Sequence, residues 1–405
     1  MTKLNVVQVP SIKKPIQDSP GFAKKMLADA KLDVMALCGF GCSYCSSNTG
    51  NYLRINREEF ADLTEAQLGL RTYPADDPSL TFTWPNLLDN LAAQLATKKK
   101  SWGTGQTLIV SQLTDAFSPL AVAPIDGGPS LTERALTMVL EQTSFRIRVL
   151  TKGAVVSSSK WIEFFLRYPG RFVVGLSVGS LDDQWARRVE VGTSSPSARI
   201  RATRALQDAG VPTFGMLCPI FPDAMDGEAL DRLIEGIRPE RCETVWAEPF
   251  NDRGNWRKVQ AGYEPGTAGH RWFDDVYRDG QAGAWSRYAT ELYRAIHNRS
   301  IGTDGWTDKL HYLLYEGDIT RNDASTFAGF SGVLLQGTCT EAVARDAEDR
   351  VITIASGPRK GQPKTVSTGW SSNTHICALQ LHEGHGYVKP GFPAPPVVAV
   401  KASAS

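Results

Sequence analysis

Short apolar runs alternate with longer amphipathic runs over the middle of the chain. The apolar runs predict buried strands at 32–38, 107–111, 145–150, 172–178, 211–217 and 243–247. The amphipathic runs predict helices at 57–68, 86–100, 131–142, 159–168, 196–209 and 227–236. Strands that alternate with helices of this length are typical of βαβ units and a parallel sheet. The pattern therefore predicts an α/β fold, a partial (β/α)6 TIM-like barrel, whose site lies at the carboxyl ends of the strands.

The two ends of the chain depart from this alternation. Residues 1–30 carry three prolines and predict an N-terminal arm with a helix at 22–30, which leads into the barrel at 31–255. Residues 256–389 predict a C-terminal α+β extension, a lid or substrate-recognition region. Its expected elements are a helix at 285–296 and strands at 310–315, 350–355 and 375–381. Residues 390–405 are rich in proline and alanine and predict a loose tail.

Composition narrows the class of protein. The 405 residues are 42% hydrophobic and 21% charged, with a formal net charge of +1, which disfavours a strongly basic nucleic-acid-binding surface. No apolar run is long enough to cross a membrane, and Met1–Lys14 lacks the apolar core of a signal peptide. The seven cysteines are an odd number with three crowded together, which does not suit a disulfide framework. Reduced thiols predict a cytoplasmic protein.

Three thiols lie in one glycine-rich stretch directly after the first predicted strand. Cys38, Cys42 and Cys45 have the spacing C-x3-C-x2-C. Thiolates are soft ligands suited to iron–sulfur clusters, zinc or copper(I). Bound to a [4Fe–4S] cluster, three cysteines leave one iron open to a small molecule with an amine and a carboxylate. The alternative is a non-catalytic zinc scaffold, but a fourth zinc ligand would have to come from a distant residue such as Cys218 or His270.

Polar side chains follow the next predicted strands. Thr114 comes after the second strand, Lys152 after the third and Ser177 at the end of the fourth. The carboxyl ends of parallel strands meet at one edge, so these groups are expected to lie together. Hydroxyl oxygens suit an ammonium group and a lysine suits a carboxylate. The strand ends therefore predict a binding site for an amino-acid moiety.

These features together resemble the spore photoproduct lyase branch of the radical S-adenosylmethionine (SAM) proteins. Besides the cysteine spacing, the resemblance rests on Phe22-Ala23-Lys24-Lys25, Thr114-Asp115, Thr151-Lys152, Ser177, Glu190, 195–204 and 219–222. It covers roughly residues 20–255. It implies a [4Fe–4S] cluster on Cys38, Cys42 and Cys45, with SAM at the open iron.

The resemblance also implies roles for other residues. It places Tyr44 beside the adenine of SAM, and Thr114, Lys152 and Ser177 near its amino-acid moiety. Glu190 and Arg199 are further candidate contacts. A flavodoxin- or ferredoxin-type protein would supply one electron, and reductive cleavage of SAM would give a 5′-deoxyadenosyl radical that takes a hydrogen atom from the substrate.

One departure from the family bears on the substrate. In the lyase, a cysteine two residues before the position of Thr114 returns a hydrogen atom to the substrate radical, whereas this chain has Gln112. An amide N–H bond is too strong for that role, so a small molecule or peptide is the expected substrate. Cys218, Glu248 and Asn251, at the ends of the last two strands, are candidate catalytic or substrate-binding residues.

The alternative substrate is a nucleic-acid lesion. It would use a phosphate-binding face made of the arginines at 187, 188, 199, 201 and 204. In the C-terminal region, His375, Cys377, His382 and His385, with Cys339, are candidates for a second metal site, although no fourth-ligand pattern is clean.

Overall fold

A computed structural model describes residues 5–10, 12–23, 25–225, 227–280, 283–302, 304–315, 323, 333–336, 350–353 and 361–366. The chain is of mixed α/β type and divides into two compact units, residues 1–281 and 282–405. Each unit is described by itself.

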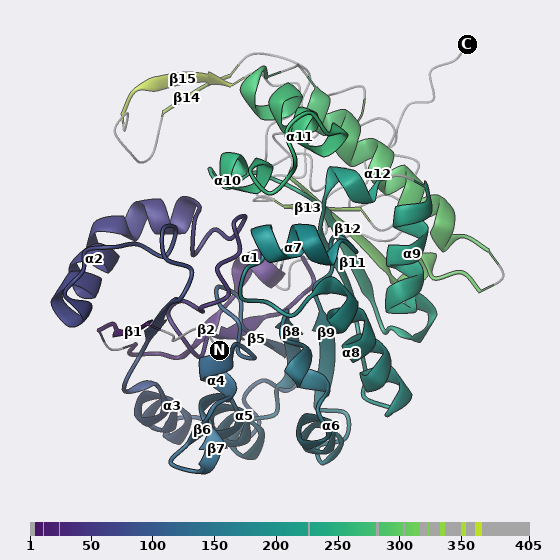
Figure 1. Ribbon diagram of the computed structural model, residues 1–405. Helices are drawn as coiled ribbons and strands as arrows, with labels where there is room; N and C mark the ends of the chain where they lie inside the picture. Colours follow the sequence, from purple (N-terminus) through teal and green to yellow (C-terminus); the bar gives the residue numbers. More distant parts are fainter. Residues whose placement is uncertain are drawn as a thin grey trace. The chain divides into compact units, whose positions relative to one another are not determined.

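Six parallel strands organise the first unit. They are β3 (Ala30–Leu32), β5 (Thr107–Val110), β8 (Arg146–Thr151), β9 (Phe172–Leu176), β10 (Gly215–Ile220) and β11 (Val245–Pro249). The first four pair in that order, and β10 pairs with β11. Isolated parallel bridges, Val174 to Thr213 and Ser177 to Met216, join β9 to β10. The spatial order of the strands follows their order in the chain, as the alternation predicts (Figure 1).

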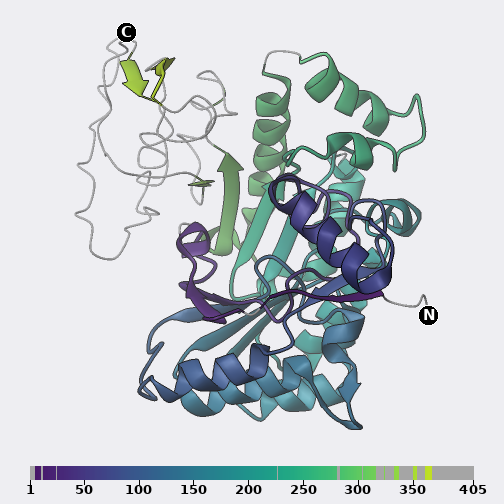
Figure 2. The ribbon, with the colours of Figure 1, turned by 90° about the vertical axis from the view of Figure 1, so that its left-hand side faces the viewer.

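Amphipathic helices cover one face of this sheet. They are α3 (Leu87–Ala96), α5 (Leu131–Gln142), α6 (Ser159–Leu166), α8 (Pro196–Asp208) and α9 (Gly227–Ile237). In α5 the buried positions Ala135, Leu136 and Val139 recur at helical spacing and join the core that also holds the strand residues. Figures 1 and 2 both show α3 and α5 beneath the sheet. This arrangement leaves the ends of the strands accessible to loops.

The N-terminal residues add strands at the edges. β1 (Asn5–Gln8) pairs in parallel with β4 (Leu80–Thr83), and β2 (Ile16–Asp18) pairs antiparallel with β3. The predicted helix at 22–30 is wrong, because α1 spans only Pro20–Ala23 and Met26 takes a left-handed conformation with φ of 54°. The long helix α2 (Asn51–Leu68) begins six residues earlier than predicted.

Three of the predicted strands have different boundaries in the structure. The apolar run to Leu37 is buried, yet it leaves the sheet after Leu32, and Leu37 instead bridges Phe82. The apolar residues after Leu32 are therefore buried without forming strand pairs in the main sheet. β10 and β11 both begin and end later than predicted. Cys218 and Glu248 therefore lie within these strands and not after them.

Shorter elements complete the first unit. They are α4 (Pro119–Val122), β6 (Pro124–Ile125), β7 (Gly128–Ser130), α7 (Asp183–Val189), α10 (Trp256–Gln260), α11 (Ala268–Phe273), a π-helix at Asp274–Arg278, and 3-10 turns at Ala154–Ser157, Pro222–Ala224 and Pro239–Arg241. The second unit contains α12 (Ala284–Ser300), a 3-10 turn at Thr307–Lys309, β12 (Leu310–Tyr315) parallel to β13 (Val333–Gln336), and β14 (Arg350–Thr353) antiparallel to β15 (Pro363–Val366).

The described part of the second unit confirms the predicted helix near 285–296 and the strands near 310–315 and 350–355. The predicted strand at 375–381, the tail at 390–405 and the second-metal candidates Cys339, His375, Cys377, His382 and His385 lie outside the described residues. Within the described ranges, no helix has both the length and the apolar character that a membrane span requires.

Gly179 permits the close approach of the segments that follow β9 and end β10. A Cβ at Gly179 would lie 1.6 Å from the carbonyl oxygen of Pro219. Only a shift of the backbone could relieve this clash. We expect Gly179→Ala to lower the free energy of unfolding by about 3 kcal/mol, measured by urea denaturation. Gly21→Ala is the control, because a Cβ at Gly21 meets no atom within 4 Å. Equal denaturation midpoints for the two variants would contradict this reading of the packing.

Candidate functional site

The three predicted ligand thiols lie together in the loop between β3 and α2. Cys38 and Cys42 are buried, Cys45 is half-buried, and all three are free thiols. Burial, with a smaller contribution from the nearby Cys45, raises the pKa of the Cys38 thiol to about 12. Burial also raises the pKa of Cys42, with Glu190, Cys45 and Cys38 adding to the effect and Lys152 opposing it.

Side chains from two segments hold the backbone of this cysteine loop. The Thr49 hydroxyl lies 2.6 Å from the carbonyl oxygen of Ser43 and 3.0 Å from that of Cys45. Asn48 donates to the carbonyl of Cys38 at 3.2 Å. Asn255, which follows β11, donates to Cys45 at 3.4 Å and to Thr49 at 3.1 Å. The loop is therefore shaped before any ligand binds.

The donor set of the cysteine loop suits an iron–sulfur cluster with one open iron, because one short loop offers three soft thiols. Gly41 has φ of +60°, and a Cβ there would lie 2.5 Å from the Cβ of Pro78, so only glycine lets the loop turn so tightly. Within the described ranges, no group of three or more His, Cys, Asp or Glu side chains is arranged to hold a metal ion. The fit therefore rests on the chemistry and the crowding of the thiols.

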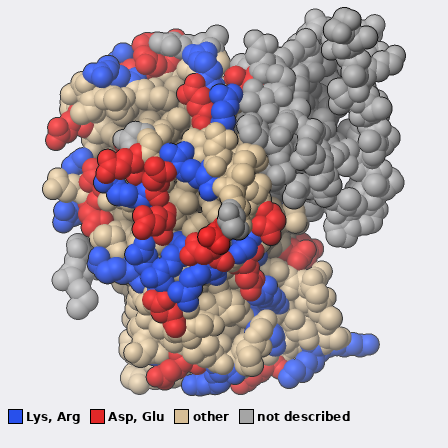
Figure 3. Space-filling view, turned by 90° about the vertical axis from the view of Figure 1, so that its right-hand side faces the viewer, with Lys and Arg blue, Asp and Glu red and all other residues tan. Residues whose placement is uncertain are grey.

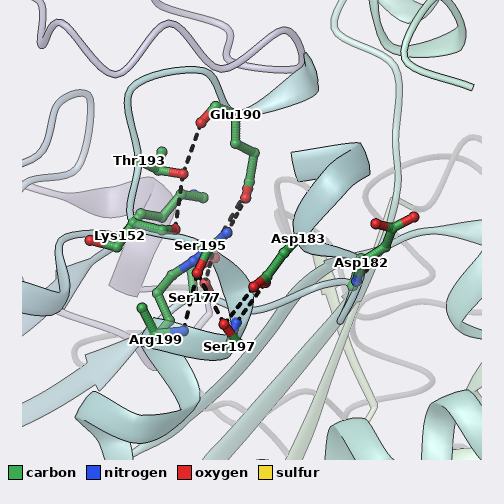
Figure 4. Close-up of polar contacts among 12 residues, drawn as sticks. Lys152, Ser177, Asp182, Asp183, Glu190, Thr193, Ser195, Ser197 and Arg199 are labelled. Carbon is green, nitrogen blue, oxygen red and sulfur yellow. Dashed lines mark hydrogen bonds and ion pairs between the residues drawn. The ribbon is translucent and has the colours of Figure 1, made fainter. Parts of the chain in front are cut away.

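A buried ion pair lies behind the cysteine loop. Glu190 and Arg199 are 5% and 1% exposed, and their side chains form an ion pair (Figure 4). Tyr44 donates its hydroxyl hydrogen to Glu190, and Arg199 also donates to the carbonyl of Ser177 at 2.6 Å. Burial alone would raise the pKa of Glu190, but the charges of Arg199 and Lys152 and the hydrogen bonds lower it below its usual value. Glu190 is therefore ionised and holds Tyr44.

Lys152 places a positive charge beside the thiols. Its ammonium nitrogen lies 5.4 Å from the centre of the Tyr44 ring. Burial by itself would lower the pKa of Lys152, but Cys42 in its ionised form and the Glu190 carboxylate raise it overall. In the part of the chain that the structure describes, no side chain forms a hydrogen bond or close ion pair with this ammonium. It is therefore available to an anionic ligand.

Asp115 fixes the backbone that carries Lys152. Its carboxylate accepts hydrogen bonds from the Lys152 amide at 2.8 Å, the Thr151 hydroxyl at 2.7 Å and the Phe117 amide at 2.8 Å. Burial raises the pKa of Asp115, and these hydrogen bonds oppose the rise. Asp115 belongs to the Thr114-Asp115 pair that contributes to the family resemblance, but the sequence predicts no role for its carboxylate. Its position directly after a strand was the available signal.

The two predicted hydroxyl groups differ in their contacts. Thr114 Oγ1 is buried and has no hydrogen-bond partner among the described residues. Ser177 donates its hydroxyl hydrogen to the carbonyl of Cys218, which leaves its oxygen able to accept a hydrogen bond. Both oxygens can therefore accept from an ammonium group.

Cys218, whose carbonyl accepts the Ser177 hydroxyl, also contacts the carboxylate of Glu248 through its thiol. Cys218 Sγ lies 3.1 Å from Glu248 Oε2. Burial raises the pKa of Cys218 well above its usual value, and Glu248 adds to this, whereas Lys25 and Lys152 oppose it. The thiol is therefore neutral. Asn251 is half-buried and lies two residues beyond the end of β11.

Asn255 is a second residue of the site for which the sequence predicts no role. It is 5% exposed and ties the segment after β11 to the cysteine loop. An asparagine before a short helix carries no local signal for this contact, because its partner Cys45 lies far away in the sequence.

One of the five arginines proposed as a phosphate-binding face cannot belong to it. Arg199 is buried in its pair with Glu190. Arg188 and Arg204 donate to the carbonyls of Gly262 and Gly236. On the face shown in Figure 3, Lys and Arg are interspersed with Asp and Glu. The expected face is therefore wrong in including Arg199.

Comparison with known sequences gives a partial match. No protein-family model matches this chain. Uncharacterized proteins of Mycobacterium bovis and Mycobacterium tuberculosis are each 32% identical to it over 114 residues, 27% of this chain and 33% of the relative. The match therefore spans about a third of the length of these curated relatives.

Comparison with solved structures finds likeness to two enzymes. A spore photoproduct lyase mutant with bound AdoMet and dinucleoside spore photoproduct has a TM-score of 0.42 at 17% identity, over 76% of this chain and 80% of that one. anSMEcpe with bound AdoMet has a TM-score of 0.32 at 11% identity, over 62% of this chain and 59% of that one. At such scores the functional argument rests on the residues of the site.

Removing the charge of Glu190 tests the buried pair. Glu190→Gln leaves Arg199 buried without its counter-charge, so we expect a loss of about 3–5 kcal/mol in the free energy of unfolding. Glu228→Gln, which breaks an exposed pair with Arg232 on α9, should change it by less than about 1 kcal/mol. Chemical denaturation measures both. Similar losses for the two variants would show that the buried pair has no special weight.

Proposed function

We propose that this chain is a radical SAM enzyme that modifies a small molecule or peptide. The observation that carries the proposal is the gathering of three free thiols in one tight loop, beside a lysine ammonium and a buried threonine hydroxyl that lack partners among the described residues. In this proposal the six parallel strands curl into the partial barrel, and residues 256–389 serve as a lid or substrate-recognition region.

Cys38, Cys42 and Cys45 would hold a [4Fe–4S] cluster. When bound, the cluster supplies one electron, taken from a flavodoxin- or ferredoxin-type protein, for reductive cleavage of a carbon–sulfur bond of SAM. The chain's own part is to shape the loop and to limit access of water. Asn48, Thr49 and Asn255 do the first through their backbone hydrogen bonds.

SAM binding falls to three polar side chains that follow or end successive strands. Lys152 pairs with the carboxylate of the amino-acid moiety, and Thr114 and Ser177 accept hydrogen bonds from its ammonium. Tyr44 borders the adenine, and its ring is held by the hydrogen bond to Glu190. Glu190 and Arg199 thus act on SAM through Tyr44, because their own charges are spent on each other.

Substrate binding falls to Cys218, Glu248 and Asn251. The neutral thiol of Cys218 and the carboxylate of Glu248 offer a donor and an acceptor at adjacent strands. Gln112 does not supply a hydrogen-atom donor, and Arg199, one of the five arginines of the alternative phosphate-binding face, is buried in its pair with Glu190. A small molecule or peptide therefore suits the site better than a nucleic-acid lesion.

Anaerobic reconstitution with iron, sulfide and reductant tests the cluster. We expect a brown protein with about four irons per chain that cleaves SAM, with the products identified by mass spectrometry. Cys42→Ala should lose both the iron and the cleavage. Cys242→Ala is the matched control, because this buried cysteine lies in a separate setting beside Gln207 and Thr213 and should keep both. Zinc at the three thiols, without iron or sulfide, would refute the proposal in favour of a scaffold.

Calorimetric titration of the reconstituted protein tests the SAM site. We expect Lys152→Met and Thr114→Val each to weaken SAM binding about tenfold, equivalent to about 1.4 kcal/mol, because each removes a charge or acceptor assigned to the amino-acid moiety. Lys160→Met removes an exposed lysine that pairs with Glu133, so it should leave the affinity unchanged. Wild-type affinity in both site variants would show that SAM binds elsewhere.

A further inference from the structure

Two segments border the cysteine loop on its surface side. The first is the start of α2, and the second is residues 252–258 after β11. A Cβ at Gly50 would lie 2.8 Å from the carbonyl oxygen of Arg253, and one at Gly254 would lie 2.6 Å from the guanidinium of Arg54. The two segments are thus in direct contact, and Figure 1 shows α2 and α10 on the same side of the sheet.

Basic side chains gather where these segments meet. We call Arg54, Arg57, Arg253, Arg257 and Lys258 the basic rim. All are exposed except Arg253, which is half-buried. A third segment, 73–76, connects the two sides of the rim. The Arg57 guanidinium lies 3.9 Å from the Tyr73 ring centre, and Lys258 donates to the carbonyl of Ala75. The rim is therefore one patch.

Three of the five basic side chains of the rim lack an acidic partner among the described residues. In the described ranges, Arg54, Arg57 and Arg257 form no ion pair with any acidic side chain. Lys258 lies 3.6 Å from Asp76. The acidic residues Glu58, Asp62 and Glu65 farther along α2 are engaged by Arg71. The first turn of this long helix adds a partial positive charge of its own.

The rim also contains an apolar contact. Ile55, between Arg54 and Arg57, is 83% exposed, the largest exposure among the large hydrophobic residues of the described chain. An exposed apolar side chain enclosed by charge suits a protein interface, in which an apolar centre is surrounded by a polar rim. It offers nothing to a phosphate backbone, so the patch fits a protein better than a nucleic acid.

We infer that the basic rim docks an acidic one-electron donor protein of the flavodoxin or ferredoxin type. The inference rests on the proposed function, because only a cluster in the cysteine loop needs such a donor. Cys45, the most exposed of the three thiols, is tied to this patch through Asn255. A donor seated here reaches the loop without crossing the barrel, and opposite charges speed its association.

Calorimetric titration with a flavodoxin of net negative charge tests the surface at low salt. The variant Arg54→Glu/Arg257→Glu should bind it at least about tenfold more weakly. The control is Arg167→Glu/Arg201→Glu, which makes the same charge change at exposed positions near the end of α6 and on α8 and should bind normally. Ile55→Ser should also weaken binding, and added salt should weaken the wild type. Equal affinity in the rim and control variants overturns the inference.

Reduction rates give the second readout, on the reconstituted protein. The rim variant should be reduced at least about tenfold more slowly by flavodoxin hydroquinone and at the normal rate by dithionite. Unchanged reduction by flavodoxin, or an equal loss with dithionite, overturns the docking surface. So does a rim variant that loses only its affinity for a single-stranded oligonucleotide. A chain that binds flavodoxin through the rim yet takes up no iron keeps the docking surface and refutes the proposed function.

Discussion

The buried ion pair between Glu190 and Arg199 is the interaction on which the site depends. Moving two charges out of water costs several kcal/mol, which is offset only when both groups have partners in place. Here the carboxylate also accepts from Tyr44, and the guanidinium also donates to the carbonyl of Ser177. The segment that carries Glu190 bridges Cys42. One pair thus sets the relative positions of the cysteine loop, the end of β9 and α8, and it specifies geometry more than it adds stability.

The same charges decide what the loop can hold. Burial raises the pKa of Cys38 and Cys42, so both thiols keep their protons until a cation displaces them. Lys152 opposes that effect at Cys42 and offsets part of the negative charge that three thiolates would bring. A buried site with a fixed positive charge beside its thiols favours a cluster that carries negative charge overall. Cys218 is likewise held neutral, because burial raises the pKa of its thiol and the nearby Glu248 adds to the effect.

Local patterns predicted much of this arrangement. The helix at 131–142 and the strand at 310–315 match to the residue, because hydrophobic period and run length are local properties. The prediction failed at 32–38, since Leu37 is buried outside the main sheet and pairs with Phe82. The strand-end residues Thr114 and Lys152 could be predicted because parallel strands bring their carboxyl ends together. The role of Asn255 could not, because its contact with Cys45 depends on the folded path of two distant loops.

The segment 111–115 contains both polar groups that are hydrogen-bonded within the protein and one hydroxyl, that of Thr114, that is not. Ser111 has φ of 81°, a conformation that costs a non-glycine residue on the order of 1–3 kcal/mol. Leu113 offsets that cost by bonding to Asp33 through its amide and to Ser47 through its carbonyl. In this well-bonded segment, Thr114 Oγ1 is buried without a partner among the described residues. Buried polar atoms are rarely left so. In the proposed function, this unbonded hydroxyl is a group whose hydrogen-bonding capacity the bound SAM would satisfy.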